Sequence, residues 1–126
     1  MNETSPAILC IDDEEPALTM RRIVLERAGY RVIAAMTGKQ GIEIFRRQPI
    51  DVVILDYWMA DMDGLDVAAE LKAISPKTPI LMLSGYASIL DEGLGKVDLW
   101  LRKGQGDPKQ FLAAVARMLT RKRSKA

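Results

Sequence analysis

Short apolar segments rich in branched side chains alternate along the chain with longer segments of mixed character. The apolar segments are Ala7–Ile11, Arg31–Ala35, Asp51–Leu55, Pro79–Leu83 and Asp98–Leu101. Their nearly continuous apolar character is typical of strands in a parallel sheet that is covered on both faces. We therefore expect five strands, separated by stretches long enough to form helices.

The intervening segments have the spacing of amphipathic helices. We predict helices over Glu15–Ala28, Gly38–Arg47, Leu65–Ile74 and Pro108–Arg121, and a shorter one over Ala87–Leu94. Gly29 is expected to end the first helix, Thr37 to cap the second and Asp107 to cap the last. Gly93 and Gly95 weaken the fourth helix, which we expect to be short or mobile.

This order repeats a β-α unit about five times, which predicts right-handed crossovers and an α/β fold. We expect a flavodoxin-like, doubly wound, five-stranded parallel sheet, (βα)5. The 126 residues suit one domain over residues 1–126, with a core over about 7–119. The basic residues within 121–126 are expected to form a frayed, solvated tail.

Composition narrows the function mainly by exclusion. A formal net charge of +1 gives no strong attraction to nucleic acid or membranes, and no apolar run is long enough to span a bilayer. The absence of histidine excludes a Ser-His-Asp triad and the commonest ligand of transition metals. Cys10, the single cysteine, is predicted to be a core residue, and no intramolecular disulfide can form. With no signal peptide at the N-terminus, these features favour a cytoplasmic location.

Polar residues follow four of the predicted strands. They are Asp12, Asp13 and Glu14 after the first strand, Asp56 after the third, Ser84 after the fourth, and Arg102 and Lys103 after the fifth. Parallel α/β sheets bind ligands at the carboxyl ends of their strands, so these residues are expected to share one edge. Carboxylates gathered there repel one another unless a cation lies between them, and Mg²⁺ suits such a site.

This combination of side chains indicates phosphoryl transfer. Asp56 is placed to act as a carboxylate nucleophile, Ser84 to donate a hydrogen bond to a phosphoryl oxygen, and Lys103 to supply a positive charge. Each signal alone has an ordinary structural explanation. Asp12 and Asp13 suit an acidic helix start, and the other positions suit turns. Their joint placement favours the functional interpretation.

The sequence resembles the receiver domain of bacterial two-component response regulators over roughly Ala7 to Leu119. The matching pieces are residues 8–14, 51–56, 59–64 and 79–84, together with Lys103. The resemblance implies that Asp56 is the phosphoacceptor. It also implies that Mg²⁺ is held by Asp12, Asp13 and Asp56 and by the backbone carbonyl of Trp58.

The resemblance gives roles to three further residues. Ser84 matches the hydroxyl residue that binds the phosphoryl group, and Lys103 matches the lysine of the family site. Trp100 matches the aromatic residue that, with Ser84, switches conformation. The helix Glu15–Ala28 matches the surface on which the kinase docks.

The chain departs from the family pattern at several positions. Ala60 and Gly104 stand where proline is usual, Gly85 replaces alanine, and Trp100 replaces tyrosine or phenylalanine. The stretch from Ser84 to Lys103 is also shorter than usual. These departures bear on how a signal leaves the domain more than on the chemistry.

We therefore predict a signalling switch rather than a conventional enzyme. Its phosphodonor would be a sensor histidine kinase or phosphotransfer protein, and its output an unknown downstream protein, with a homodimer left open and no direct contact with nucleic acid or membrane expected. The chain either acts alone, as its starting Met1 favours, or is a receiver cut from a longer protein.

Other functions remain open at this level. The first is a pseudo-receiver that binds partners without phosphorylation, favoured by Gly104 and the short fourth segment. The second is an aspartate-nucleophile phosphatase, which is disfavoured because Trp58 stands where such enzymes carry a second aspartate. Nucleic-acid binding through the basic tail is the weakest alternative.

Overall fold

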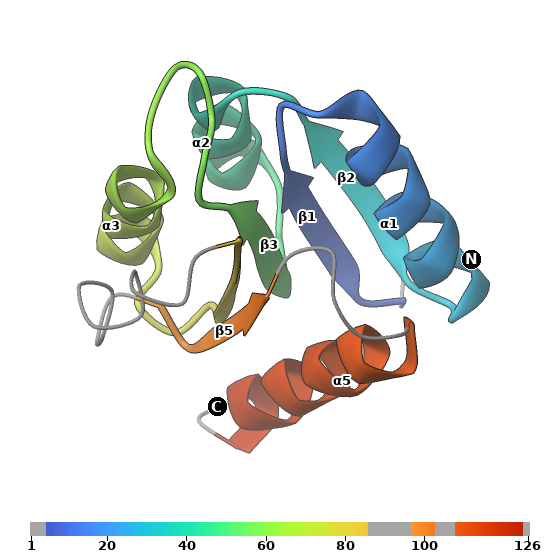
Figure 1. The fold of residues 1–126 in the computed structure, drawn as a ribbon. Coiled ribbons are helices and arrows are strands. Elements are labelled where there is room, and N and C mark those ends of the chain that lie inside the picture. The colour runs from blue at the N-terminus through green and yellow to red at the C-terminus, as the bar shows by residue number, and fades with distance from the viewer. Residues whose placement is uncertain (1–4, 86–96, 103–107, 125–126) are drawn as a thin grey trace.

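The computed structural model describes residues 5–85, 97–102 and 108–124 (Figure 1). The predicted fourth helix, Ala87–Leu94, and the predicted cap Asp107 lie outside these residues. None of the described helices is both long and apolar enough to cross a bilayer.

Five parallel strands form one sheet in the order β2-β1-β3-β4-β5. The strands are β1 (Ala7–Ile11), β2 (Arg31–Ala35), β3 (Val52–Asp56), β4 (Ile80–Ser84) and β5 (Leu99–Arg102). The helices are α1 (Glu15–Arg27), α2 (Gly38–Arg47), α3 (Gly64–Ile74) and α5 (Pro108–Ser124). In Figure 1, α2 and α3 cover one face of the sheet, and α1 and α5 cover the other. The predicted doubly wound α/β fold is therefore confirmed.

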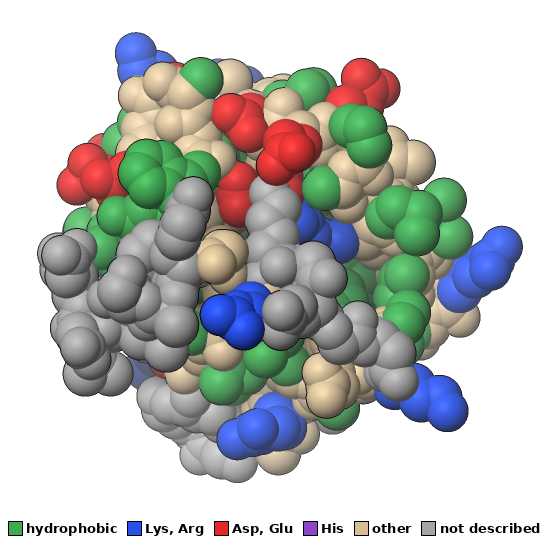
Figure 2. All heavy atoms as spheres, viewed as in Figure 1, with side chains coloured by type: hydrophobic (Ala, Val, Ile, Leu, Met, Phe, Trp, Pro, Cys, Tyr) green, Lys and Arg blue, Asp and Glu red, His purple; other side chains and the backbone are tan. Residues whose placement is uncertain are grey.

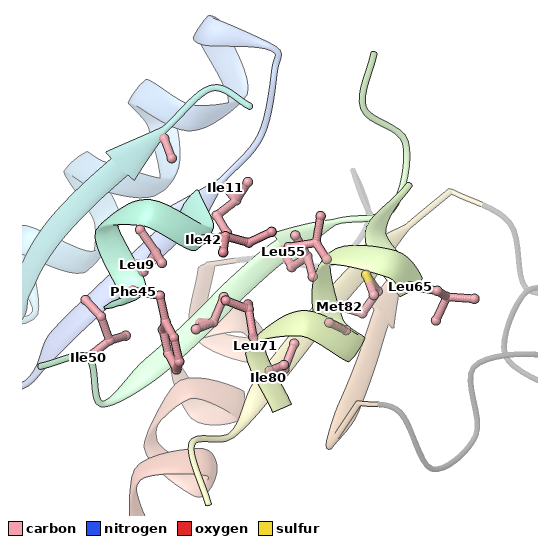
Figure 3. Close-up of a cluster of buried hydrophobic side chains, with 14 of the residues drawn as sticks. Leu9, Ile11, Ile42, Phe45, Ile50, Leu55, Leu65, Leu71, Ile80 and Met82 are labelled. Carbon is pink, nitrogen blue, oxygen red and sulfur yellow. The ribbon is translucent and has the colours of Figure 1, made fainter. Parts of the chain in front are cut away.

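The hydrophobic core has two parts, one on each face of the sheet. Figure 3 shows the part beneath α2 and α3, where Ile42, Phe45 and Leu71 pack against strand residues such as Leu9 and Leu55. Every position of β1, β3 and β4 is buried, which explains the continuous apolar runs of the sequence.

Cys10 belongs to the part of the core beneath α1 and α5, as predicted. Burial raises the pKa of its thiol to about 12. The thiolate is therefore suppressed near neutral pH, and Cys10 behaves as a small apolar side chain.

Three strands lie one residue later than their predicted ranges. The prediction ended β3, β4 and β5 before their polar residues, but Asp56, Ser84 and Arg102 are each the last residue of a strand. Asp56 pairs with Leu83 and Ser84 with Arg102 in the sheet. The reason for the shift is that backbone hydrogen bonds continue past the point where side chains become polar.

The helix ends agree with most of the predicted signals. Gly29 follows α1 with a φ of 98°, a conformation that favours glycine. The Thr37 hydroxyl accepts a hydrogen bond from the Gln40 N–H over 3.0 Å at the start of α2. Asp63 caps α3 in the same way, a role that the sequence analysis missed.

Helix α5 differs from its prediction at the carboxyl end. It continues to Ser124, three residues beyond the predicted Arg121, so the start of the basic tail is helical rather than frayed. Arg121, Lys122 and Arg123 are residues with good intrinsic helix propensity, which is consistent with this extension.

Candidate functional site

Three aspartates meet where β1 and β3 end. Asp12 follows β1 directly, Asp13 comes next, and Asp56 is the last residue of β3. Each offers one carboxylate oxygen, and these oxygens lie within 4.8 Å of one another. Asp12 is fully buried and Asp56 is 2% exposed, whereas Asp13 is half-buried. We call these three residues the acidic cluster.

Asp12 is held by two contacts, one from the residue that precedes α1 and one from α1 itself. Its Oδ1 accepts a hydrogen bond from the Glu14 N–H over 2.9 Å, just before the helix begins. Its Oδ2 forms an ion pair with the Arg21 guanidinium over 2.6 Å. Arg21 was not among the predicted site residues, because Asp12 precedes α1 and no local spacing rule links the two positions.

The loop that follows Asp56 is tied to two other loops. The Ala60 N–H donates to Asp13 Oδ2 over 2.9 Å. The carboxylate of Asp61 accepts from the N–H groups of Gly38 and Lys39 at the start of α2, over 2.9 and 3.1 Å. Partial burial works against ionisation of Asp61, but these backbone hydrogen bonds outweigh it and lower the pKa of this carboxyl group.

Gly64 fixes the backbone at the phosphoacceptor candidate. Its N–H donates to the carbonyl oxygen of Tyr57 over 2.8 Å, which closes the loop between β3 and α3. A Cβ atom at position 64 would lie 2.8 Å from Tyr57 Cα and 2.9 Å from the backbone oxygen of Asp56. Only glycine tolerates this close approach of backbone.

Ser84 ends the strand next to the one that carries Asp56. It is buried at the end of β4, and β4 neighbours β3 in the sheet. Arg102 pairs with Ser84 at the end of β5. Lys103, the next residue in the sequence, lies outside the described residues, so its predicted place in the site stays a prediction.

Aromatic rings extend from the cluster toward β5. Trp58 is 58% exposed and meets Tyr57 edge-on, with the ring centroids 5.2 Å apart. Trp100, half-buried on β5, lies 6.5 Å from Tyr57 between ring centroids. The site-adjacent loop and β5 are thus in contact through Tyr57.

The donor set of the acidic cluster fits a hard divalent cation. It consists of carboxylate oxygens, and Mg²⁺ prefers oxygen ligands and retains several waters. Figure 2 shows acidic side chains gathered on the upper part of the face it presents, with basic side chains below them. A cation between the carboxylates would relieve their mutual repulsion.

The model of the response regulator receiver domain matches residues 8–94 of this chain. The chain belongs to this family. The receiver fold is also found in solved structures. A CheY-like receiver domain protein from Methanospirillum hungatei has a TM-score of 0.92 at 23% identity, covering 98% of this chain and all of that one. Response regulator TrrA from Thermotoga maritima, solved in complex with Mg²⁺–BeF, has a TM-score of 0.86 at 25% identity, covering 90% of this chain and 99% of that one.

Curated relatives of this receiver domain are much longer proteins. The transcriptional regulatory protein ZraR of Escherichia coli is 38% identical over 82 residues, which are 65% of this chain and 19% of ZraR. The autoinducer 1 sensor kinase/phosphatase LuxN of Vibrio campbellii is 33% identical over 85 residues, 68% of this chain and 10% of LuxN. Receiver domains are signalling switches rather than conventional enzymes.

Proposed function

We propose that this receiver domain accepts a phosphoryl group on Asp56 in a Mg²⁺-dependent reaction, and that the phosphorylated state changes its protein interactions. The acidic cluster supports this proposal most strongly. Asp56 is buried at the end of a central strand, near Asp12 and Asp13, and Ser84 is the last residue of the neighbouring strand β4. A nucleophile, a cation site and a hydrogen-bond donor are the groups that phosphoryl transfer requires.

In the proposed reaction a carboxylate oxygen of Asp56 forms a bond to phosphorus. The bond from phosphorus to the imidazole nitrogen of a phosphohistidine breaks, and the electron pair stays on that nitrogen. Asp12, Asp13, Asp56 and the backbone carbonyl of Trp58 would hold Mg²⁺. When bound, this ion offsets the negative charge of the phosphoryl oxygens.

Ser84 and Lys103 complete the proposed site. The Ser84 hydroxyl would donate a hydrogen bond to a phosphoryl oxygen, and Lys103 would supply a second positive charge. Trp100 is the proposed switch residue, and its proximity to Tyr57 supports a route from Asp56 to β5. The output surface would therefore include β5.

The phosphodonor is proposed to be a sensor histidine kinase or phosphotransfer protein. Related receiver segments occur in the sensor kinase/phosphatase LuxN and in the transcriptional regulator ZraR. Helix α1 is the proposed docking surface for the donor, and it exposes the apolar side chains of Met20 and Ile23. The downstream partner is proposed to be another protein.

The test is the intact mass of the protein after incubation with phosphoramidate, with and without Mg²⁺. We expect a gain of one phosphoryl group that requires Mg²⁺ and is lost in Asp56→Asn. Asp66→Asn, which changes an exposed aspartate on α3, is the matched control and should be phosphorylated like the wild type. No gain from phosphoramidate or from a phosphorylated kinase, in folded protein that binds Mg²⁺, would favour the pseudo-receiver instead.

A further inference from the structure

Arg21 differs from its neighbour on α1 because its guanidinium is withdrawn from solvent. The side chain of Arg21 is 12% exposed, and that of its partner Asp12 is 0% exposed. Arginine side chains on a helix surface ordinarily keep the charged group in water. Arg22 follows that habit, since its side chain is 48% exposed and it pairs with Glu26 over 3.4 Å. The unusual burial of the Arg21 side chain must therefore be explained by its partner, Asp12.

The acidic cluster supplies this cause. Asp12 contributes one of the three carboxylates whose oxygens lie within 4.8 Å of one another. Both of its oxygens already bind protein donors, Oδ1 the Glu14 N–H and Oδ2 the Arg21 guanidinium. Arg21 thus offsets one negative charge of the cluster, at the place where a divalent cation would bind.

We infer that Arg21 is a resident counter-charge that stabilises the acidic cluster in the metal-free state and weakens the binding of Mg²⁺. This inference rests on the cation-binding part of the proposed function. The guanidinium lies against a carboxylate of the cation site, so a bound cation and Arg21 repel each other across a short, poorly solvated distance. Arg21 is a positioning residue, because it acts through Asp12.

The two effects of Arg21 have opposite signs. Removing its charge leaves Asp12 buried without that partner, which destabilises the metal-free protein. The same change removes the repulsion felt by the cation, which tightens its binding. An ion pair with a purely structural role would produce only the first effect.

The experiment is calorimetric titration of MgCl₂ into the wild type, Arg21→Met, Arg21→Lys and Arg22→Met at constant ionic strength. We expect Arg21→Met to bind Mg²⁺ at least about tenfold more tightly than the wild type. Arg21→Lys retains the charge, and Arg22→Met is the matched change one residue along α1. Both should stay within about threefold of the wild type. Mg²⁺ should also raise the melting temperature of Arg21→Met more than that of the wild type.

Two outcomes overturn the inference and are distinguishable. If the wild type binds Mg²⁺ and Arg21→Met binds it equally or more weakly, the inference is wrong while the proposed function stands. If neither protein binds Mg²⁺, the cation-binding part of the proposed function fails as well. Arg21→Gln keeps a neutral hydrogen-bond donor for Asp12, and it replaces Arg21→Met in the same comparison if that variant does not fold.

Discussion

We call the side of the sheet where its strands begin the amino edge, and the side where they end the carboxyl edge. Aspartate side chains have different surroundings at these two edges. At the amino edge, each carboxylate is matched with nearby donors. Asp51 Oδ2 accepts a hydrogen bond from the Ala7 N–H over 2.8 Å. Asp98 Oδ2 accepts from the Ile80 N–H and from the Lys72 ammonium, each over 2.7 Å. Asp51 precedes β3 and binds the first residue of β1, and Asp98 precedes β5 and binds the first residue of β4.

At the carboxyl edge, three aspartates instead converge within 4.8 Å. Like charges at this distance raise the free energy of the folded state unless cations offset them. We therefore expect the aspartates of the amino edge to contribute to stability, and the excess negative charge of the carboxyl edge, which Arg21 offsets only in part, to lower it. The difference lies in how the charges are grouped, because the residue type is the same.

The largest stability effect is expected at the amino edge, from Asp98→Ala. This change leaves the Ile80 N–H without its carboxylate and the half-buried Lys72 without its ion pair. We expect the free energy of unfolding to fall by about 3 kcal/mol, measured by urea denaturation. The control Glu43→Ala breaks an exposed pair with Arg47 and should cost less than about 1 kcal/mol. Equally small losses of stability in Asp98→Ala and Glu43→Ala would contradict the stabilising role given to the aspartates of the amino edge.

Gly64→Ala should disturb the carboxyl edge through the backbone. The added Cβ meets Tyr57 Cα and the Asp56 carbonyl, which have no room to yield. We expect a loss of about 2 kcal/mol in the free energy of unfolding, together with slower phosphorylation at constant phosphoramidate. Gly85→Ala is the control, because a Cβ there meets nothing within 4 Å among the residues that the structure describes. Phosphorylation at the wild-type rate in Gly64→Ala would show that the close approach does not position Asp56.

Asp61→Ala should have a smaller effect that depends on pH. Helix α2 has no acidic residue in its first turn, and Asp61 supplies the negative charge from the neighbouring loop. The pKa of Asp61 is lowered from its ordinary 3.8, so its contribution is present above that pH and is lost as pH falls through the lowered value. We expect a loss of about 1 kcal/mol at pH 7 that shrinks below about pH 4. Urea denaturation at pH 7 and at pH 3 measures the loss in the free energy of unfolding at each pH. Equal losses at the two pH values would contradict the prediction.

Much of the fold follows from local sequence patterns. The bounds of β1, β2 and α2 were predicted to the residue, because apolar runs and the Thr37 cap mark them directly. The ends of β3 and β4 were one residue short, because hydrogen bonding in a sheet depends on the neighbouring strand. Asp56 pairs with Leu83, and sequence patterns do not give that register.

The grouping of Asp12, Asp13 and Asp56 was predictable because parallel strands deliver their ends to one edge. The contacts of Arg21 and Asp61 could not be predicted from the sequence. Consecutive helix residues point about 100° apart, so the phase of α1 decides that Arg21 and not Arg22 turns toward Asp12. Asp61 caps α2 from a loop more than twenty residues away, and no local pattern specifies such a contact.

The contrast between the edges is tested most directly by Asp13→Asn, measured as the free energy of unfolding in EDTA and in excess Mg²⁺. Asparagine keeps an oxygen for the Ala60 N–H but removes one charge from the acidic cluster. We predict that the variant is about 1 kcal/mol more stable than the wild type in EDTA and gains less from Mg²⁺. Asp98→Asn should instead be less stable than the wild type in both conditions, and Mg²⁺ should raise its free energy of unfolding as much as it does for the wild type. An Asp13→Asn protein that is less stable than the wild type in EDTA, yet equally stabilised by Mg²⁺, would contradict the view that the carboxyl-edge aspartates are held together for a cation.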